Sequence, residues 1–83
     1  MSRQSGRMFP LADYISADEW LRQLFSSKAA RDGGVVRRKV GDVERIVGCL
    51  RFEHEIRRRG FRAVQNGRQY VVFCNRESIR LIE

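Results

Sequence analysis

Residues 42–74 read DVERIVGCLRFEHEIRRRGFRAVQNGRQYVVFC, and the predicted fold depends mainly on them. Apolar residues before and after Gly48 both follow a helical period, but their phase changes at the glycine. The first set is Val43, Ile46, Val47 and Leu50, and the second is Cys49, Phe52 and Ile56. The pattern predicts two helices joined by a short turn at Gly48, with Asp42 as the N-cap of the first. One continuous helix over 42–59 is the alternative.

The end of this stretch predicts a helix stop followed by a β-hairpin. Gly60 is placed to end the second helix in the left-handed conformation, with Phe61 as its hydrophobic partner. Asn66-Gly67 lies between two strand-like segments, which favours a two-residue hairpin turn at those two residues.

This predicted register gives the hairpin two different faces. One face is apolar and pairs Ala63 with Tyr70 and Phe61 with Val72. The other face is mixed and holds Arg62, Val64, Val71 and Phe73. Since the apolar part of this mixed face needs a cover, the alternating segment 78–82 is predicted as a further strand.

The N-terminal half predicts one helix and one strand. Ser16 to Glu19 form a capping box, in which Ser16 caps a helix running to about Ala30 and Glu19 reaches back to the Ser16 N–H. Four apolar residues of that helix share one face and are expected in the core: Trp20, Leu21, Leu24 and Phe25. Residues 35–40 are β-branched and basic and predict a strand, with a helical turn as the alternative.

Length and composition limit the class of protein. The 83 residues predict a loose tail over 1–8 and a single domain over 9–83. No apolar run approaches the roughly 20 residues of a membrane span, and no signal peptide is recognisable, so a cytoplasmic protein without membrane contact is expected. Cys49 and Cys74 with the single His54 form no metal-binding pattern, and no cofactor is expected. The two cysteines are interpreted as buried free thiols, with a mutual disulfide as the alternative.

The charge distribution favours a nucleic-acid partner. The net charge is +7, and fifteen of the seventeen basic residues are Arg, whose planar fork matches phosphate. Residues 31–83 hold thirteen basic and seven acidic side chains, so the excess lies in the half that contains the hairpin. The predicted order of helix, strand, helix, helix and hairpin is that of a winged helix. We therefore expect an α+β, winged-helix-like domain with three helices, a β-hairpin and a short additional strand.

The predicted function is nucleic-acid binding, with DNA favoured over RNA. The predicted contact residues are basic side chains of the second helix, the hairpin and the first strand: Arg51, Arg57, Arg58, Arg62, Arg68, Arg37, Arg38 and Lys39. Enzyme motifs are absent, so no enzymatic activity is expected. The alternative is a protein-interaction or dimerisation module. RNA binding by stacking on the sheet is disfavoured, because Tyr70 and Phe73 fall on opposite faces of the predicted hairpin.

Two resemblances accompany this interpretation. The segment 42–75 resembles a group of short, uncharacterised bacterial proteins, some of which carry the label phosphoribosylanthranilate isomerase. That enzyme is a TIM barrel, which takes about 200–250 residues, so its activity is not expected of this chain. The segment 55–73 also resembles a small toxin fold that binds double-stranded RNA. That fold depends on a Gly-Ser-His segment, and this chain has Asn66-Gly67-Arg68 instead, so the resemblance implies no catalytic residue.

Overall fold

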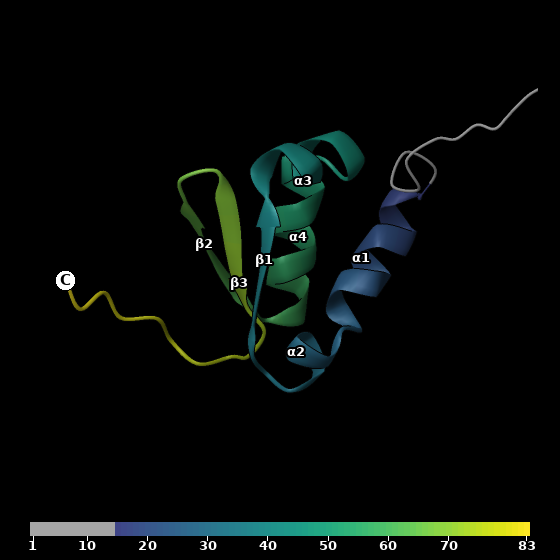
Figure 1. Cartoon of the computed structure of the whole chain (residues 1–83). Helices are drawn as coiled ribbons and strands as arrows, with labels where there is room; N and C mark the ends of the chain where they lie inside the picture. The colour runs from purple at the N-terminus through teal and green to yellow at the C-terminus, as the bar shows by residue number, and fades with distance from the viewer. Residues whose placement is uncertain (1–14) are drawn as a thin grey trace, which may run out of the picture.

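The computed structural model describes residues 15–83, which form helices and one three-stranded antiparallel sheet (Figure 1). The predicted α+β class is confirmed. The elements are α1 (Ala17–Phe25), α2 (Lys28–Arg31), β1 (Val35–Lys39), α3 (Val40–Ile46), α4 (Cys49–Arg59), β2 (Arg62–Asn66) and β3 (Gln69–Phe73). The predicted tail at 1–8 and the first residues of the predicted domain lie outside the described residues. No helix of 15–83 has the length and apolar character needed to cross a membrane.

Ser16 caps α1, as the sequence predicts. Its side-chain oxygen accepts a hydrogen bond from the Glu19 N–H at 3.1 Å. The other half of the predicted capping box is wrong, because the Glu19 carboxylate binds Arg22 instead of the Ser16 N–H. The buried residues of α1 are Leu21, Leu24 and Phe25, all on the predicted face.

The predicted helix to Ala30 is wrong in length, because two serines divide it. α1 ends at Phe25, and Ser27 caps the separate short helix α2. The Ser27 hydroxyl donates to the Leu24 carbonyl at 2.9 Å and accepts from the Ala30 N–H at 3.3 Å. Serine side chains that bind nearby backbone groups compete with helical hydrogen bonds, so the helix breaks and the described chain has four helices instead of three.

Gly48 separates α3 from α4, which confirms the prediction of two helices. Its φ is +93°, a conformation that only glycine adopts without strain. The start of α3 differs from the prediction. β1 leads directly into the helix, which begins at Val40 and has Lys39 at its N-cap. Asp42 lies in the first turn of α3 instead of capping it, and pairs with Arg45 at 3.4 Å.

Gly60 ends α4 as predicted. Its φ is +77°, in the left-handed region. The Phe61 N–H then donates to the Ile56 carbonyl at 3.0 Å, and the Phe61 ring lies 5.9 Å from the ring of Phe25. This stop turns the chain back from the helix toward the sheet.

The sheet has the order β1-β3-β2, with the hairpin strand β3 in the centre. The turn occupies Gly67 and Arg68, so the predicted turn at Asn66-Gly67 is wrong by one position. Asn66 instead pairs with Gln69, and Ala63 pairs with Val72 instead of Tyr70. Because this shifts the register by two residues, each side chain keeps its predicted face.

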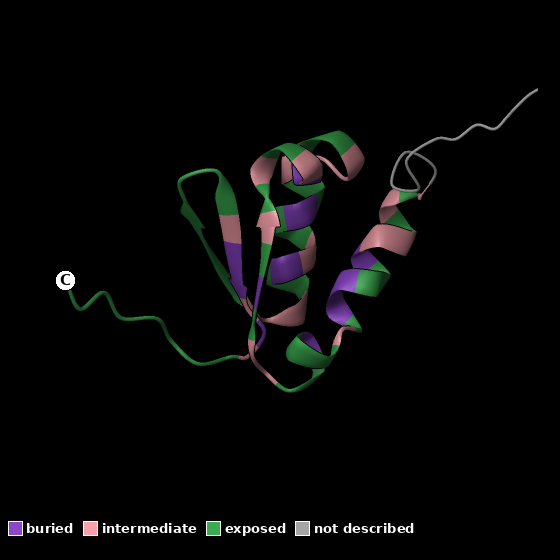
Figure 2. Ribbon diagram, in the orientation of Figure 1, coloured by how far each residue is buried: buried purple, intermediate pink, exposed green. Residues whose placement is uncertain are grey.

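The helix α4 lies between the sheet and α1 (Figure 1). Phe52 is at the centre and is only 1% exposed. Its ring stacks on Tyr70 of β3 at 5.2 Å between centroids and meets Trp20 of α1 edge-on at 6.3 Å. Figure 2 shows the buried residues on the facing sides of α1, α4 and β3. The core is Leu21, Leu24, Phe25, Ala30, Val36, Val43, Phe52, Ile56, Val72 and Cys74.

The C-terminal segment 76–83 forms no helix or strand, so the predicted strand over 78–82 is wrong. The third strand of the sheet is β1. The segment runs away from the sheet and the helices (Figure 1). It carries three exposed apolar side chains, Ile79, Leu81 and Ile82.

Candidate nucleic-acid interface

Among residues 15–83, no helix packs on one face of the sheet. Val36 and Val72 belong to the core under α4, so the residues that alternate with them point away from the helices. The strand register arranges nine such residues in three rows, which we call the open sheet face. The rows are Val35, Phe73 and Arg62; Arg37, Val71 and Val64; and Lys39, Gln69 and Asn66. Neighbouring rows are about 7 Å apart along the strands.

The open sheet face is positively charged. It carries Arg37, Lys39 and Arg62 and no carboxylate. All three side chains belong to exposed residues, and none forms an ion pair within residues 15–83. An anion that approaches this face therefore meets three cations and no competing acid of the same face.

The centre of this face is apolar. Val71 is only 8% exposed, because it lies in the central strand with Arg37 and Val64 as its cross-strand neighbours. Phe73 is half-buried in the next row. Phe73 is the single aromatic side chain of the open sheet face, and Tyr70 points to the core side, so the face has no platform on which several bases could stack.

Three of the four arginines of α4 are held by carboxylates. Arg51 binds Asp18 of α1. Arg58 and Arg59 both bind Glu55, one turn earlier on α4. The Arg59 guanidinium also lies over the Phe25 ring, 4.3 Å from its centroid. These cations therefore connect α4 with itself and with α1.

The environment of Glu55 keeps it ionised. The hydrogen bond from Arg58 is the largest cause that lowers the pKa of this carboxyl below its ordinary value. The positive charges of Arg58 and Arg59 act in the same direction, while burial opposes them. The same hydrogen bond raises the pKa of Arg58. At neutral pH the pair is therefore fully charged.

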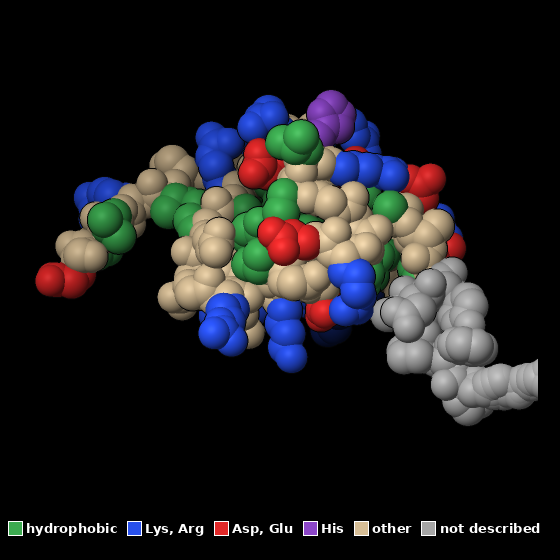
Figure 3. All heavy atoms as spheres, turned by 90° about the horizontal axis from the view of Figure 1, so that it is seen from above, with side chains coloured by type: hydrophobic (Ala, Val, Ile, Leu, Met, Phe, Trp, Pro, Cys, Tyr) green, Lys and Arg blue, Asp and Glu red, His purple; other side chains and the backbone are tan. Residues whose placement is uncertain are grey.

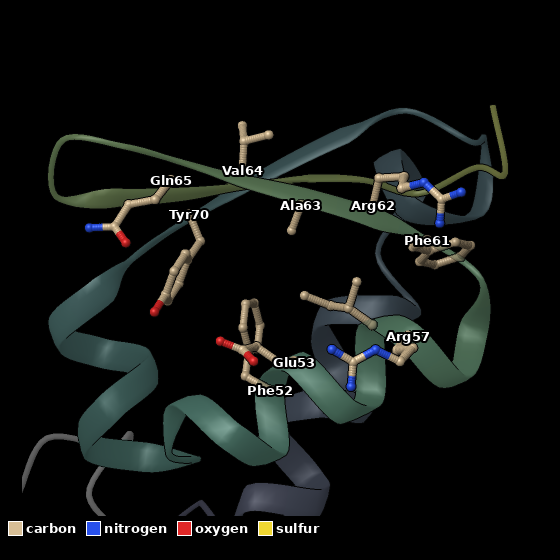
Figure 4. A pocket seen from close by; sticks show the side chains of 10 residues that line it. Phe52, Glu53, Arg57, Phe61, Arg62, Ala63, Val64, Gln65 and Tyr70 are labelled. Carbon is tan, nitrogen blue, oxygen red and sulfur yellow. The ribbon is translucent and has the colours of Figure 1, made fainter. Parts of the chain in front are cut away.

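Arg57 is the remaining arginine of α4 and has no ion-pair partner among residues 15–83. It lines a groove of about 450 Å³ between α4 and β2, which we call the α4–β2 groove (Figure 4). Arg62 and Glu53 also line this groove. Its apolar lining is Phe52, Ile56, Phe61, Ala63, Val64 and Tyr70. All five residues of β2, which forms one wall of the groove, are exposed.

Arg38 and Arg68 lie in other places. Arg38 shares a register position with Tyr70 on the core side of β1, and its guanidinium donates to the Arg37 carbonyl at 2.6 Å. Arg68 is in the hairpin turn, where its carbonyl accepts from the Val40 N–H at 2.9 Å. That bond fixes the turn against the start of α3.

The eight predicted contact residues thus do not form one cluster. They are Arg37, Lys39 and Arg62 on the open sheet face, Arg57 in the α4–β2 groove, Arg68 in the turn, Arg38 on the core side of β1, and Arg51 and Arg58 beside α1. Figure 3 shows Lys and Arg side chains on opposite sides of the molecule, with Asp and Glu among them. Their contacts with nucleic acid stay predictions.

Sequence reasoning missed the α4–β2 groove. The alternation of Phe61 and Ala63 predicts a covered core face, but every residue of β2 is exposed within residues 15–83, and the Phe52 ring of α4 stacks on Tyr70 of β3 instead. The side chains that follow Phe61 on this face could have indicated that no helix covers β2. Ala63 is small and Gln65 is polar, so they give a helix little apolar surface to cover.

Cys49 and Tyr70 form a separate polar contact at the first turn of α4. The Cys49 sulfur lies 3.3 Å from the Tyr70 hydroxyl and 3.6 Å from the Glu44 carboxylate. The contact with Cys49 is the main cause that raises the pKa of Tyr70 to about 12, and desolvation adds to it. Cys74 is buried, which raises the pKa of its thiol, and both cysteines are free. Residues 15–83 contain no group of His, Cys, Asp and Glu that could hold a metal ion.

No protein-family model matches this chain, and neither a curated protein nor a solved structure is significantly similar to it.

Proposed function

We propose that this chain binds nucleic acid, and duplex DNA in particular, by contacting phosphates with the open sheet face. The observation that carries the proposal is the set of three exposed cations, Arg37, Lys39 and Arg62, on a face without a carboxylate. Lys and Arg that neutralise phosphates release counterions, and this release drives most sequence-independent binding. The net charge of +7 acts in the same direction.

A winged-helix-type domain is the architecture that we propose for this binder. The order of the helices and strands and the hairpin at the end of the chain support it. In such a domain the helix before the hairpin enters the major groove. Here that helix is α4, and Arg51, Arg58 and Arg59 are already paired with acids. The proposed binding therefore depends more on β1 and the hairpin than on α4.

The expected binding is largely independent of base sequence. Phosphate contacts position a protein on the duplex but carry no direct sequence information. The open sheet face offers two amide side chains, Gln69 and Asn66, beside its cations. Because the turn between the hairpin strands is only two residues long, the hairpin has little reach into a groove.

The test is a salt titration with two variants of equal charge. The affinity for a fluorescent duplex is measured at several salt concentrations for the wild type, for Arg37→Gln/Lys39→Gln/Arg62→Gln, and for Arg22→Gln/Lys28→Gln/Arg31→Gln. The second variant removes three cations from α1 and α2 and is the matched control. Each phosphate contact adds a slope of ~0.9 in a plot of log affinity against log salt.

We expect the wild type and the control to share a slope of about 3, and the sheet variant to lose most of it. Equal losses in both variants would mean that only the net charge matters, and would contradict the assignment to the open sheet face. Binding that is absent at low salt in the wild type would contradict the proposed function itself.

A further inference from the structure

The C-terminal segment carries three apolar side chains that are exposed within residues 15–83. Leu81 is 87% exposed, Ile82 is 77% exposed and Ile79 is 44% exposed. Ile79 and Leu81 are two positions apart, so in an extended chain they point to the same side. The segment leaves the end of β3 and runs away from the rest of the molecule (Figure 1).

The α4–β2 groove is the complementary feature on the same chain. Its lining includes Phe52, Ile56 and Tyr70, and one wall is the edge strand β2. Figure 4 shows the Tyr70 and Ala63 side chains directed from the sheet toward α4, across the space that the groove occupies. β2 pairs only with β3, so the backbone groups of its outer edge have no strand partner among residues 15–83.

We propose that residues 77–83 of one copy occupy the α4–β2 groove of a second copy, as a strand added to the edge of β2. Extended segments bind sheet edges in this way, with backbone hydrogen bonds along the edge and alternate side chains in pockets. Ile79 and Leu81 then enter the apolar groove, and Arg80 and Ile82 point out of it. Two copies can exchange these segments about a two-fold axis. Each groove of the dimer is then filled by the Ile79 and Leu81 side chains of the other copy.

The charges of the two parts are complementary. Residues 77–83 contain two acids, Glu77 and Glu83, and one base, Arg80. The groove is lined by Arg57, by Glu53 and, at its edge, by Arg62, which also belongs to the open sheet face. An acidic segment therefore meets a basic groove.

The direction of the segment selects a second copy over the chain's own groove. Phe73 at the end of β3 pairs with Arg62 at the start of β2, so the segment begins beside one end of the groove. From there it runs outward and does not fold back along β2 (Figure 1). An outward segment is placed to reach a neighbouring molecule.

The first test is the molar mass of the full chain in solution, measured by light scattering after size exclusion from low to high micromolar concentration without nucleic acid. The wild type is expected to reach the dimer mass as its concentration rises. Ile79→Asp/Leu81→Asp is expected to stay monomeric, and Ser78→Asp, which adds charge without removing an apolar group, is expected to dimerise. A wild type that is monomeric throughout, or a dimer that survives Ile79→Asp/Leu81→Asp, would overturn the proposal.

A mixing experiment distinguishes exchange between copies from other dimers. Ala63→Glu places a larger, acidic side chain in the groove at an exposed position, and this variant alone is expected to be monomeric. A mixture of Ala63→Glu with Ile79→Asp/Leu81→Asp retains one intact segment and one intact groove, so it is expected to form mixed dimers. A mixture that remains monomeric, while the wild type dimerises, would exclude the exchange. None of these substitutions removes a cation of the open sheet face, so this proposal and the proposed function can fail independently.

Discussion

The Arg51 guanidinium on α4 is bound by the Asp18 carboxylate on α1, which lies 33 positions earlier in the chain. Both side chains remain well exposed, and exposed ion pairs of this kind stabilise a fold by less than about 1 kcal/mol. The pair matters more for function than for stability. It occupies one of the arginines that the sequence assigns to a nucleic-acid contact.

Replacement of Arg51 should therefore leave DNA binding almost unchanged. In Arg51→Gln we expect a salt slope equal to that of the wild type, and a free energy of unfolding within about 1 kcal/mol of it. In Arg37→Gln, which removes one cation from the open sheet face, the slope should fall by ~0.9. The duplex titration measures both variants, and a larger loss in Arg51→Gln than in Arg37→Gln would contradict the assignment.

Phe52 should be the most sensitive position of the core. It is 1% exposed and contacts both Tyr70 and Trp20, so Phe52→Ala is expected to cost about 3–5 kcal/mol of unfolding free energy. The adjacent Leu50 is 83% exposed, and Leu50→Ala should change stability by no more than about 0.5 kcal/mol. Thermal unfolding followed by circular dichroism compares the two variants. Similar melting temperatures would mean that α4 does not pack on the sheet as described.

Two glycines test the helix boundary. Gly48 has a φ of +93°, so Gly48→Ala should cost about 1–3 kcal/mol although no atom lies within 4 Å of the added Cβ. Gly41 also has free space around an added Cβ, but it lies inside α3. Gly41→Ala should therefore stabilise the protein by about 0.5–1 kcal/mol, because alanine favours a helix. Urea unfolding gives both values, and a neutral Gly48→Ala would contradict the division of the two helices.

Glu55 predicts a dependence of stability on pH. Its pKa is lower in the folded state than in the unfolded state, because the folded carboxylate is bound by Arg58 and Arg59. Its stabilising effect is thus complete above the unfolded pKa of about 4.3 and is lost as the pH falls through the lower, folded pKa. At pH 7 the melting temperature of Glu55→Gln should be lower than that of the wild type. The difference between the two melting temperatures should decrease as the pH is lowered below about 4. Glu53→Gln, at an exposed position without an ion pair among residues 15–83, is the control.

Much of the fold follows from local rules. Gly48 and Gly60 each stand where a positive φ is needed, so the change of apolar phase at Gly48 predicted where α3 and α4 meet, and Gly60 predicted where α4 ends. The alternation in the hairpin predicted which residues share a face. This prediction is correct although the turn lies one position later than predicted. The turn itself depends on a distant contact. With Gly67 and Arg68 in the turn, the Arg68 carbonyl accepts from the Val40 N–H, and no local rule at Asn66-Gly67 contains that bond.

The candidate site was only partly predictable, because it too depends on contacts between residues that are far apart in the sequence. The sequence names the basic residues, but the pairing of Arg51 with Asp18 depends on how α1 packs against α4. The open sheet face requires β1 to pair with β3, which brings Arg37 and Lys39 to the same side as Arg62. The strand predicted over 78–82 is wrong for a related reason. Its alternating pattern fits a strand, but it pairs with no strand among residues 15–83.

Binding of DNA by the open sheet face can be observed residue by residue in a heteronuclear NMR titration of the full chain with a mixed-sequence DNA duplex. We expect the largest shift changes at the backbone amides of β1 and at the Arg62 end of β2. These changes should weaken as salt is added, and the amides of α1 should change little. Shift changes concentrated on α4 around Arg51 and Arg58, or none at low salt, would contradict binding by the open sheet face.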